Sequence, residues 1–411
     1  MIKIRTIFLS LLCLLLFAQP LHAETVKKPA LKNVKNFFKK RSVDIFPVPV
    51  FDTRPDEGNT YGLMPVMILS DENKAIKTIF GLIGQYNSIT KTSGAALAYF
   101  YPEADEEISF YGQWAQKFYR EATLRFFNPT FLKHYYIDAN FSALQTPFGR
   151  FFGLGANQNH SAQSNFTSRN FTFDITGGYY LLSHLRANLT ARFHSTDLKG
   201  RAITSVADTL TRYASLSNVT DSTNFIPGVS LAFDNRPERE YSTTGSYTNL
   251  GFLFSNQALG SDKNFQGWNL EATQLIPTIN NRLTSALRFH FEEIFGGNIP
   301  FYEMSSLGGD KELRAFVPMR FVDHGKMIFQ LEERAKVLKV KVLGNPIEIY
   351  FDPFFEVGRV FNSLSTMGFT QWQAVGGGGL RIFVPPNVIA RIDGAYGSDG
   401  FEVYTELGYP F

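Results

Sequence analysis

Hydrophobic and polar residues alternate along most of this chain. In the C-terminal stretch FEVYTELGYPF, the odd-numbered positions from Phe401 to Phe411 are predicted to face one way and the even-numbered positions the other. Residues 268–273 and 283–291 repeat this period of two, which is typical of β-strands. The candidate strands are about 10–14 residues long, long enough to cross a membrane when tilted and longer than most strands of soluble sandwiches. The pattern predicts an all-β, membrane-spanning antiparallel barrel.

The connections between these strands alternate between short and long. Short ones are 71–74, 182–184, 277–281 and 385–387, and long polar ones are 146–169, 199–224 and 296–325. Short periplasmic turns and long extracellular loops are typical of outer-membrane barrels. With both ends of the barrel domain in the periplasm, the number of strands must be even. We find 16 to 18 candidate strands and predict 16, in a transmembrane barrel over residues 46–411.

Composition supports a barrel. Charged residues make up 19% of the chain, aromatic residues 15%, and mean hydropathy is −0.11, so the apolar residues are dispersed and do not cluster into membrane helices. The net charge of +3 is too small to indicate a nucleic-acid partner.

The N-terminus has the features of a secretory signal peptide. Lys3 and Arg5 precede the apolar run 7–18, and a plausible cleavage site ends at Ala23, so residues 1–23 are predicted to be removed during export to the outer membrane. The single cysteine, Cys13, lies in this segment, which leaves the mature chain without disulfides or thiolate metal sites. We expect no cofactor. Residues 24–45 form a basic periplasmic segment, either a solvated linker or a short amphipathic helix that lies on the membrane or partly plugs the barrel.

A Gly-rich stretch, Leu307–Lys336, stands out between two strand patterns. It carries a lone arginine, Arg314, between Leu313 and Ala315-Phe316, and it ends in a strand that places Glu332 and Arg334 on one face. The glycine run 376–379 is not followed by a helix or by Lys-Ser/Thr, so it indicates a crowded strand and not a phosphate loop.

Several short motifs occur in an order that resembles the barrel of the BamA/TamA family of bacterial outer-membrane proteins, the bacterial surface antigen family. The motifs are Pro47-Val48-Pro49, 55–62, Phe151-Phe152-Gly153-Leu154-Gly155, Asp234-Asn235-Arg236 with Gly245, Leu313-Arg314-Ala315-Phe316, Glu332-Glu333-Arg334, Phe355-Glu356-Val357-Gly358, Gly379-Leu380-Arg381, Asp393-Gly394 and Phe411.

The resemblance implies that the sixth extracellular loop folds into the lumen. There Arg314 would pair with carboxylates on the next two strands, Glu332 and Glu356, and brace the barrel. From the residues alone, Arg314 could equally be a solvated loop residue. The chain departs from the family at Ala315, where the family has glycine, at Glu356, where it has aspartate, and at Ser242, where proline is common.

The same resemblance implies an insertion or translocation role at the outer membrane. A weakly paired seam between the first strand, near 61–69, and the last strand, 401–411, would admit a client strand or lipid. No POTRA domain is expected before the barrel, so a separate periplasmic partner could supply that role. The alternatives are a structural or pore-forming barrel and, less favoured, a barrel enzyme such as a phospholipase. The dispersed histidines, among them His290 beside Glu292, form no recognisable catalytic motif, and we predict no enzyme activity.

The final residues carry a separate hypothesis. Tyr409 and Phe411 resemble the C-terminal signal by which the outer-membrane assembly machinery recognises a new barrel through edge pairing. The other interpretation is that Phe411 is an apolar end residue facing outer-membrane lipid.

Overall fold

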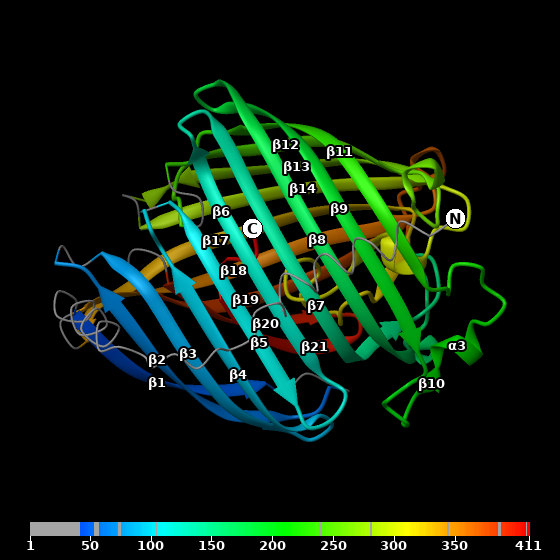
Figure 1. Ribbon diagram of the computed structural model, residues 1–411, viewed down its shortest axis with the longest axis horizontal. Helices are drawn as coiled ribbons and strands as arrows, with labels where there is room; N and C mark the ends of the chain where they lie inside the picture. The colour runs from blue at the N-terminus through cyan, green and yellow to red at the C-terminus, as the bar shows by residue number, and fades with distance from the viewer. Residues whose placement is uncertain are drawn as a thin grey trace, which may run out of the picture.

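A computed structural model describes residues 42–411 apart from 53–56, 73–74, 104, 238–240, 280–281, 343–344, 385–387 and 408. The predicted signal peptide and residues 24–41 of the basic segment lie outside this range. The described chain forms one large sheet that curls into a barrel (Figure 1). The expected all-β antiparallel barrel is confirmed. No helix within the described ranges is long and apolar enough to span a membrane.

Consecutive strands of the barrel are hydrogen-bonded neighbours. The strands of the first half are β1 (Ser42–Asp52), β2 (Thr60–Ser70), β3 (Ile76–Asn87), β4 (Lys91–Phe100), β5 (Glu107–Ala115), β6 (Arg120–Phe131), β7 (Tyr135–Phe151), β8 (Ser164–Leu182) and β9 (Leu185–Lys199). The second half contains β11 (Ser222–Asp234), β12 (Gly245–Ser255), β13 (Phe265–Pro277), β14 (Leu283–Gly296), β17 (Gly325–Val342), β18 (Asn345–Phe361), β19 (Gln373–Val384), β20 (Val388–Gly397) and β21 (Gly400–Leu407).

Short elements lie in the connections. They are η1 (His160–Ala162), β10 (Ala207–Asp208), α3 (Thr209–Arg212), η2 (Gln257–Leu259), η4 (Phe301–Glu303), β15 (Ser305–Leu307), β16 (Phe321–Asp323) and η5 (Leu364–Thr366). Of these, β10 joins the barrel sheet by a two-residue parallel pairing with β8.

The strand number differs from the prediction. The sheet of the described residues has 19 strands, of which only β10 is a two-residue fragment. Eighteen long strands therefore replace the sixteen predicted. The miscount has its source before Phe151, where runs such as TYGLMPVMILS in β2 are almost continuously apolar and hide strand boundaries. The first strand begins at Ser42, and the segment near 61–69 belongs to the second strand.

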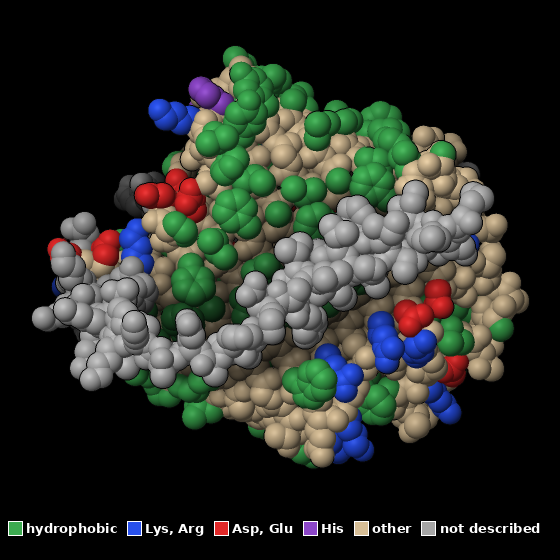
Figure 2. Space-filling model, viewed as in Figure 1, with side chains coloured by type: hydrophobic (Ala, Val, Ile, Leu, Met, Phe, Trp, Pro, Cys, Tyr) green, Lys and Arg blue, Asp and Glu red, His purple; other side chains and the backbone are tan. Residues whose placement is uncertain are grey.

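Side chains alternate between the outer surface and the lumen, with apolar residues outside. On β9, Leu189 is 70% exposed whereas the adjacent Asn188 is only 5% exposed. On β21, Phe401 is 62% exposed and Glu402 is 9% exposed. This is the reverse of a soluble sheet and is the arrangement expected when lipid surrounds the barrel. Figure 2 shows apolar side chains across the middle of the front face, with charged ones mostly toward its ends.

The two ends of the barrel differ. One, here called the long-loop end, carries the connections 152–163, 200–221, 256–264, 297–324 and 362–372, and the other, the short-turn end, carries connections such as 183–184. Loop 297–324 is the seventh connection at the long-loop end and not the sixth, because two more strands precede it than the sequence predicted. The expected alternation of short and long connections is present only in part, because the long-loop end also carries the short connections 88–90, 116–119 and 398–399.

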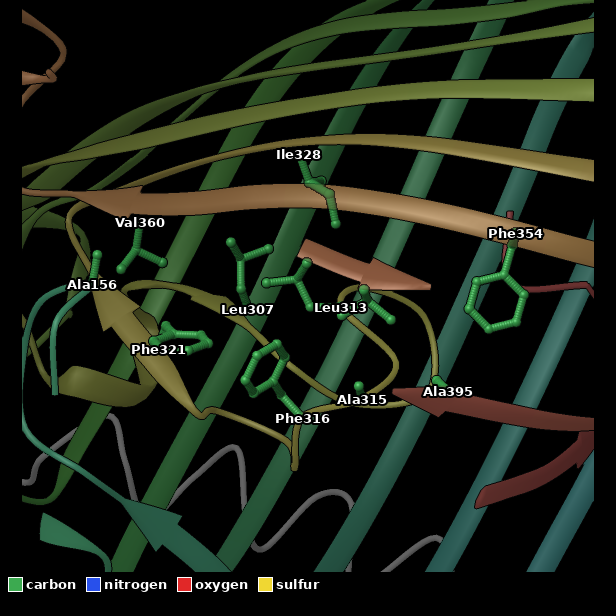
Figure 3. Packing of buried hydrophobic residues seen from close by; sticks show 11 residues of the cluster. Ala156, Leu307, Leu313, Ala315, Phe316, Phe321, Ile328, Phe354, Val360 and Ala395 are labelled. Carbon is green, nitrogen blue, oxygen red and sulfur yellow. The ribbon is translucent and has the colours of Figure 1, made fainter. Parts of the chain in front are cut away.

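Two buried apolar clusters fix the long loops. In the first, Leu307, Leu313 and Phe316 of loop 297–324 pack on Ile328 and Phe354 of the barrel wall (Figure 3). The second cluster joins several long loops to the barrel wall at the long-loop end, and it includes Phe151, Phe166, Ile299 and Phe301. Loop 297–324 is therefore held inside the barrel by apolar burial as well as by polar contacts.

The strands at the two ends of the sheet lie near each other. Between β1 and β21, however, no ladder pairing is found among the residues that the structure describes. Elsewhere each long strand is paired to the next, so this junction is the seam of the barrel.

Candidate functional site

Loop 297–324 enters the lumen as a tight hairpin. Strands β15 and β16 pair with each other, and the chain between them turns through Gly308 and Gly309, with φ of 116° and 113°. A Cβ on Gly308 would lie 2.2 Å from the carbonyl oxygen of Val317, so only glycine fits this turn. The Gly309 amide donates to the Phe316 carbonyl over 2.8 Å. The turn presents Arg314 to the barrel wall.

Arg314 is fully buried and contacts three carboxylates. Its Nε donates to Glu356 over 2.7 Å, and its Nη1 donates to Glu332 over 3.0 Å and to Asp393 over 3.1 Å. Its backbone amide donates to the second oxygen of Glu356 over 2.7 Å. The guanidinium also stacks over the Phe354 ring, 3.4 Å from its centroid. The structure thus brings together Arg314, Glu332 and Glu356, the three residues that the sequence analysis connected.

Sequence reasoning missed the rest of the cluster. Asp393 on β20 also accepts bonds from Arg381 of β19 and from Arg391 of β20, and Glu332 accepts a bond from Arg381 over 3.3 Å. All of these side chains are buried. The available signal was strand parity, because Arg381 alternates with outward-facing apolar residues in the same way that Glu332 does. The cluster joins β17, β18, β19 and β20 to the loop.

The glycine run 376–379 makes room for this cluster. A Cβ on Gly377 would lie 2.3 Å from the Phe354 ring, and one on Gly379 would lie 2.1 Å from both Arg381 Nη1 and Asp393 Oδ1. The expected crowding of this strand is therefore present, and its cause is the arginine cluster pressed against the backbone.

Ala315 fits without backbone strain. The positive φ of the motif belongs to Leu313, at 53°, and not to Ala315. The Ala315 side chain faces Gly397 of β20, where an added Cβ would lie 3.0 Å from the Ala315 methyl group. A glycine on the wall thus accommodates the methyl group that the family's glycine lacks.

Glu312 attaches the loop at a second point. It pairs with Lys326 over 2.9 Å, with His290 over 2.6 Å and with Arg288 over 3.1 Å. Burial opposes its ionisation, but Lys326, His290 and Arg288 outweigh this and hold the pKa of the Glu312 carboxyl well below its usual range. His290 therefore pairs with the loop and not with Glu292.

The C-terminal tail leaves the sheet. Strand β21 ends at Leu407, and Arg334 Nη2 donates to the Phe411 carbonyl over 3.0 Å. The Arg334 guanidinium lies 3.8 Å from the Tyr409 ring centroid. The predicted alternation up to Phe411 is wrong at its last residues. Pro410 has no amide hydrogen for a ladder, and buried Arg334 supplies a lumenal partner.

The cluster is built for pairing charges. Its arginines are held by carboxylates on neighbouring strands. In the part of the chain that the structure describes, no group of three His, Cys, Asp or Glu residues is placed to hold a metal ion.

A family model described as the Omp85 superfamily domain matches residues 105–397. The chain belongs to the Omp85 superfamily. Comparison with curated proteins gave no match. Among solved structures, this Omp85 barrel is similar to BamA from Haemophilus ducreyi lacking POTRA domains 1–3, with 14% identity and a TM-score of 0.53 over 95% of this chain and 79% of that one.

CdiB from Escherichia coli is also similar, with 10% identity and a TM-score of 0.49 over 92% of this chain and 70% of that one. At 14% identity, the likeness to BamA shows the fold alone. The resemblance drawn from the motifs is confirmed, and this Omp85 chain is a bacterial outer-membrane barrel.

Proposed function

We propose that this Omp85 barrel assists insertion or translocation of proteins or lipid at the outer membrane, and that it does so through the seam between β1 and β21. The observation that carries the proposal is the lack of a described ladder at this junction, while every other pair of adjacent long strands is hydrogen-bonded. An unpaired strand edge offers backbone donors and acceptors to another strand. A client strand could therefore pair with β1 or β21.

The inward turn of the C-terminal tail supports this role. Because Tyr409 and Phe411 contact Arg334 inside the barrel, the last strand offers β1 only the residues up to Leu407. Strand β1, which begins at Ser42, lies on the other side of the seam. Separation at the seam would then break few hydrogen bonds.

The arginine cluster has a bracing role in this proposal. It holds the loop and β17–β20 together next to the seam, so movement would be confined to β21 and β1. A planar guanidinium suits this role because it can bond several carboxylates in fixed directions. Such pairing offsets the entropy of ordering a long loop.

A disulfide across the seam tests the proposal. The double variant Ile45→Cys/Thr405→Cys places one thiol on β1 and one on β21, and the matched control Ile392→Cys/Thr405→Cys crosslinks two strands that are already paired. The probe is a urea-unfolded eight-stranded outer-membrane barrel added to vesicles containing each variant. We expect the barrel to accelerate insertion of the probe into the vesicles. Oxidation should abolish this acceleration in the seam variant but not in the control variant, and reductant should restore it. Equal acceleration by the locked and reduced seam variants would refute lateral opening.

A pore-forming role is the second candidate, and the polar lumen favours it. A cavity of about 440 Å³ is lined by polar residues that include Asp138, Asp174, Arg192 and His290. A second one, of about 480 Å³, lies at the short-turn end and is lined by Arg125, among others. Single-channel recording in planar bilayers tests this role, and steady conductance that a locked seam leaves unchanged would favour a pore over an insertase.

We further infer a non-enzymatic role. The lumenal histidines serve to attach the loop, since His194 Nδ1 lies 2.8 Å from Glu303 and His290 Nδ1 lies 2.6 Å from Glu312. Turnover of phospholipid by the purified protein would overturn this inference. We propose that a separate periplasmic partner delivers clients, and that the assembly machinery recognises the C-terminal residues before the barrel closes.

A further inference from the structure

A row of polar side chains crosses the outer surface near the long-loop end. Cross-strand pairing places Arg120 of β6 opposite Gln145 of β7, and Gln145 opposite Arg169 of β8. These three residues form the cationic row. They face outward, because Leu124 on the same face of β6 is 50% exposed and Phe173 on the same face of β8 is 42% exposed.

The side chains of the row are held in place. The Arg120 guanidinium stacks over Trp114 of β5, 4.0 Å from the ring centroid. Arg169 Nε donates to Gln145 Oε1 over 2.9 Å, while Gln145 Nε2 donates to the Phe118 carbonyl over 2.8 Å. These contacts orient both guanidiniums along the outer surface and leave most of their N–H groups available to a ligand.

Among the described residues, neither Arg120 nor Arg169 is paired with an acidic side chain. No ion pair of Arg120 or Arg169 is found in the described part of the chain, although Arg192, an arginine in the lumen on the neighbouring strand β9, pairs with Asp174. The adjacent Asp197 is paired with Lys199 over 3.0 Å. Figure 2 shows Lys and Arg side chains, with some Asp and Glu side chains among them, at the lower right of the front face. The row therefore presents two guanidinium groups without a direct ion pair among the described residues, although Asp197 of β9 lies opposite Arg169.

Apolar surface begins directly below the row. The next outward residues are Ala122 on β6, Ala143 on β7 and Phe171 on β8, and they pair across the strands as the cationic row does. Phe171 contacts Phe141 edge to face, with their ring centroids 5.1 Å apart. Fixed cations immediately above small apolar and aromatic residues match a molecule with an anionic head and acyl chains.

We propose that the cationic row binds the phosphate of a lipid in the membrane leaflet at the long-loop end, with the acyl chains against β6–β8. Guanidinium groups bond phosphate oxygens in pairs and remain charged at any physiological pH. The location beside an apolar surface selects a lipid phosphate over a free phosphate ion. The inference rests on the barrel fold and is independent of the seam.

Quenching of tryptophan fluorescence tests the proposal. The chain has three tryptophans, so Trp268→Phe/Trp372→Phe leaves Trp114, on which Arg120 of the row stacks. Trp114→Phe/Trp372→Phe leaves Trp268, which is 48% exposed on β13, a strand that is not paired with β6–β8. Each variant is placed in zwitterionic vesicles that contain a minor fraction of brominated phosphatidic acid or brominated phosphatidylcholine. We expect phosphatidic acid to be enriched at Trp114 on the order of tenfold, and not at Trp268.

The arginines supply the second arm of the test. In the Trp114-only background, Arg120→Gln/Arg169→Gln should remove the enrichment, whereas Arg120→Lys/Arg169→Lys should keep at least part of it. Inorganic phosphate should lower it no more than chloride at equal ionic strength. Equal enrichment at Trp268, retention in the glutamine variant, complete loss in the lysine variant, or displacement by free phosphate would each overturn the proposal.

Discussion

Glu356→Gln is the sharpest test of the buried arginine cluster. Glutamine has almost the size of glutamate, so the side chain still fits beside Arg314 and Gln330 while the charge is removed. One Glu356 oxygen accepts from Arg314 Nε and Gln330, and the other accepts from the Arg314 amide, at distances of 2.7–2.8 Å. A glutamine would have to turn its NH₂ group toward one of these donors. The variant loses a buried charge pair and at least one charged hydrogen bond.

The expected loss follows from the burial of both partners. Breaking one side of a buried ion pair costs about 3–5 kcal/mol. Arg314 keeps Glu332 and Asp393, so we expect a value near the lower limit, about 3 kcal/mol. The matched control is Glu271→Gln, because the Glu271 side chain is 27% exposed and pairs with Arg288 over 2.7 Å. Water weakens such a pair, and we expect a loss of about 1 kcal/mol or less.

The assay is urea unfolding of the barrel in detergent micelles, followed by tryptophan fluorescence. The free energy of unfolding of each variant is compared with that of the unmodified protein at one pH and salt concentration. Arg314→Met and the double variant Arg314→Met/Glu356→Gln complete a cycle that isolates the pair. If Glu356→Gln costs no more than Glu271→Gln, the cluster does not brace the barrel, and the reasoning fails.

Three further predictions concern the loop and the tail. Gly397→Ala should destabilise the barrel by about 1–3 kcal/mol through contact with the Ala315 methyl group, and Ala315→Gly should recover part of the loss; additive effects in urea unfolding would contradict this contact. The folded-state pKa of the Glu312 carboxyl is lowered, so its charge stabilises the barrel above a pH of about 4.3, and this stabilisation is lost as the pH falls below that value. The difference in free energy of unfolding between the unmodified protein and Glu312→Gln should therefore narrow between about pH 5 and 3. A difference that stays constant over this range would refute the role of the Glu312 charge. Deleting Phe411 should lower the amount of protein in isolated outer membranes, while Arg334→Gln, which removes the folded-state contact with Phe411 together with the Arg334–Glu332 ion pair, should not; equal loss in both would mean that Phe411 acts through stability.

The sequence predicted the barrel and part of the cluster because both depend on local patterns. A period of two residues specifies which side chains face the lumen, and Glu332 and Glu356 have the inward parity, but it was the family resemblance that implied their pairing with Arg314. The same argument applied to Arg381 and Asp393 would have extended the cluster to β19 and β20. What parity does not reveal is which inward charges lie at the same height in the barrel, since that depends on the stagger of the strands.

Other features were beyond reach for physical reasons. Strands β2 and β3 are apolar on both faces over much of their length, so their boundaries are not marked by alternation. The inward turn at Tyr409 and Phe411 results from attraction to Arg334, which lies 77 residues before Phe411 in the chain. The space at Gly397 that receives Ala315 is likewise a tertiary contact. Local pattern specifies strands, whereas contacts between distant segments decide how the ends and the loop are placed.

The buried arginine cluster also constrains the order of assembly. Arg314 lies 79 residues before Asp393, so the loop cannot complete its contacts until β20 has been made and has joined the barrel. A chain interrupted before this strand would hold the Arg314 guanidinium with fewer carboxylates, and the loop would remain free to leave the lumen. Contacts of such long sequence separation form late, since chain entropy must be lost before they stabilise anything. The loop is therefore stably inserted only after the C-terminal strands have joined the barrel. A truncated barrel would differ from a complete one in having a lumen that the loop does not fill.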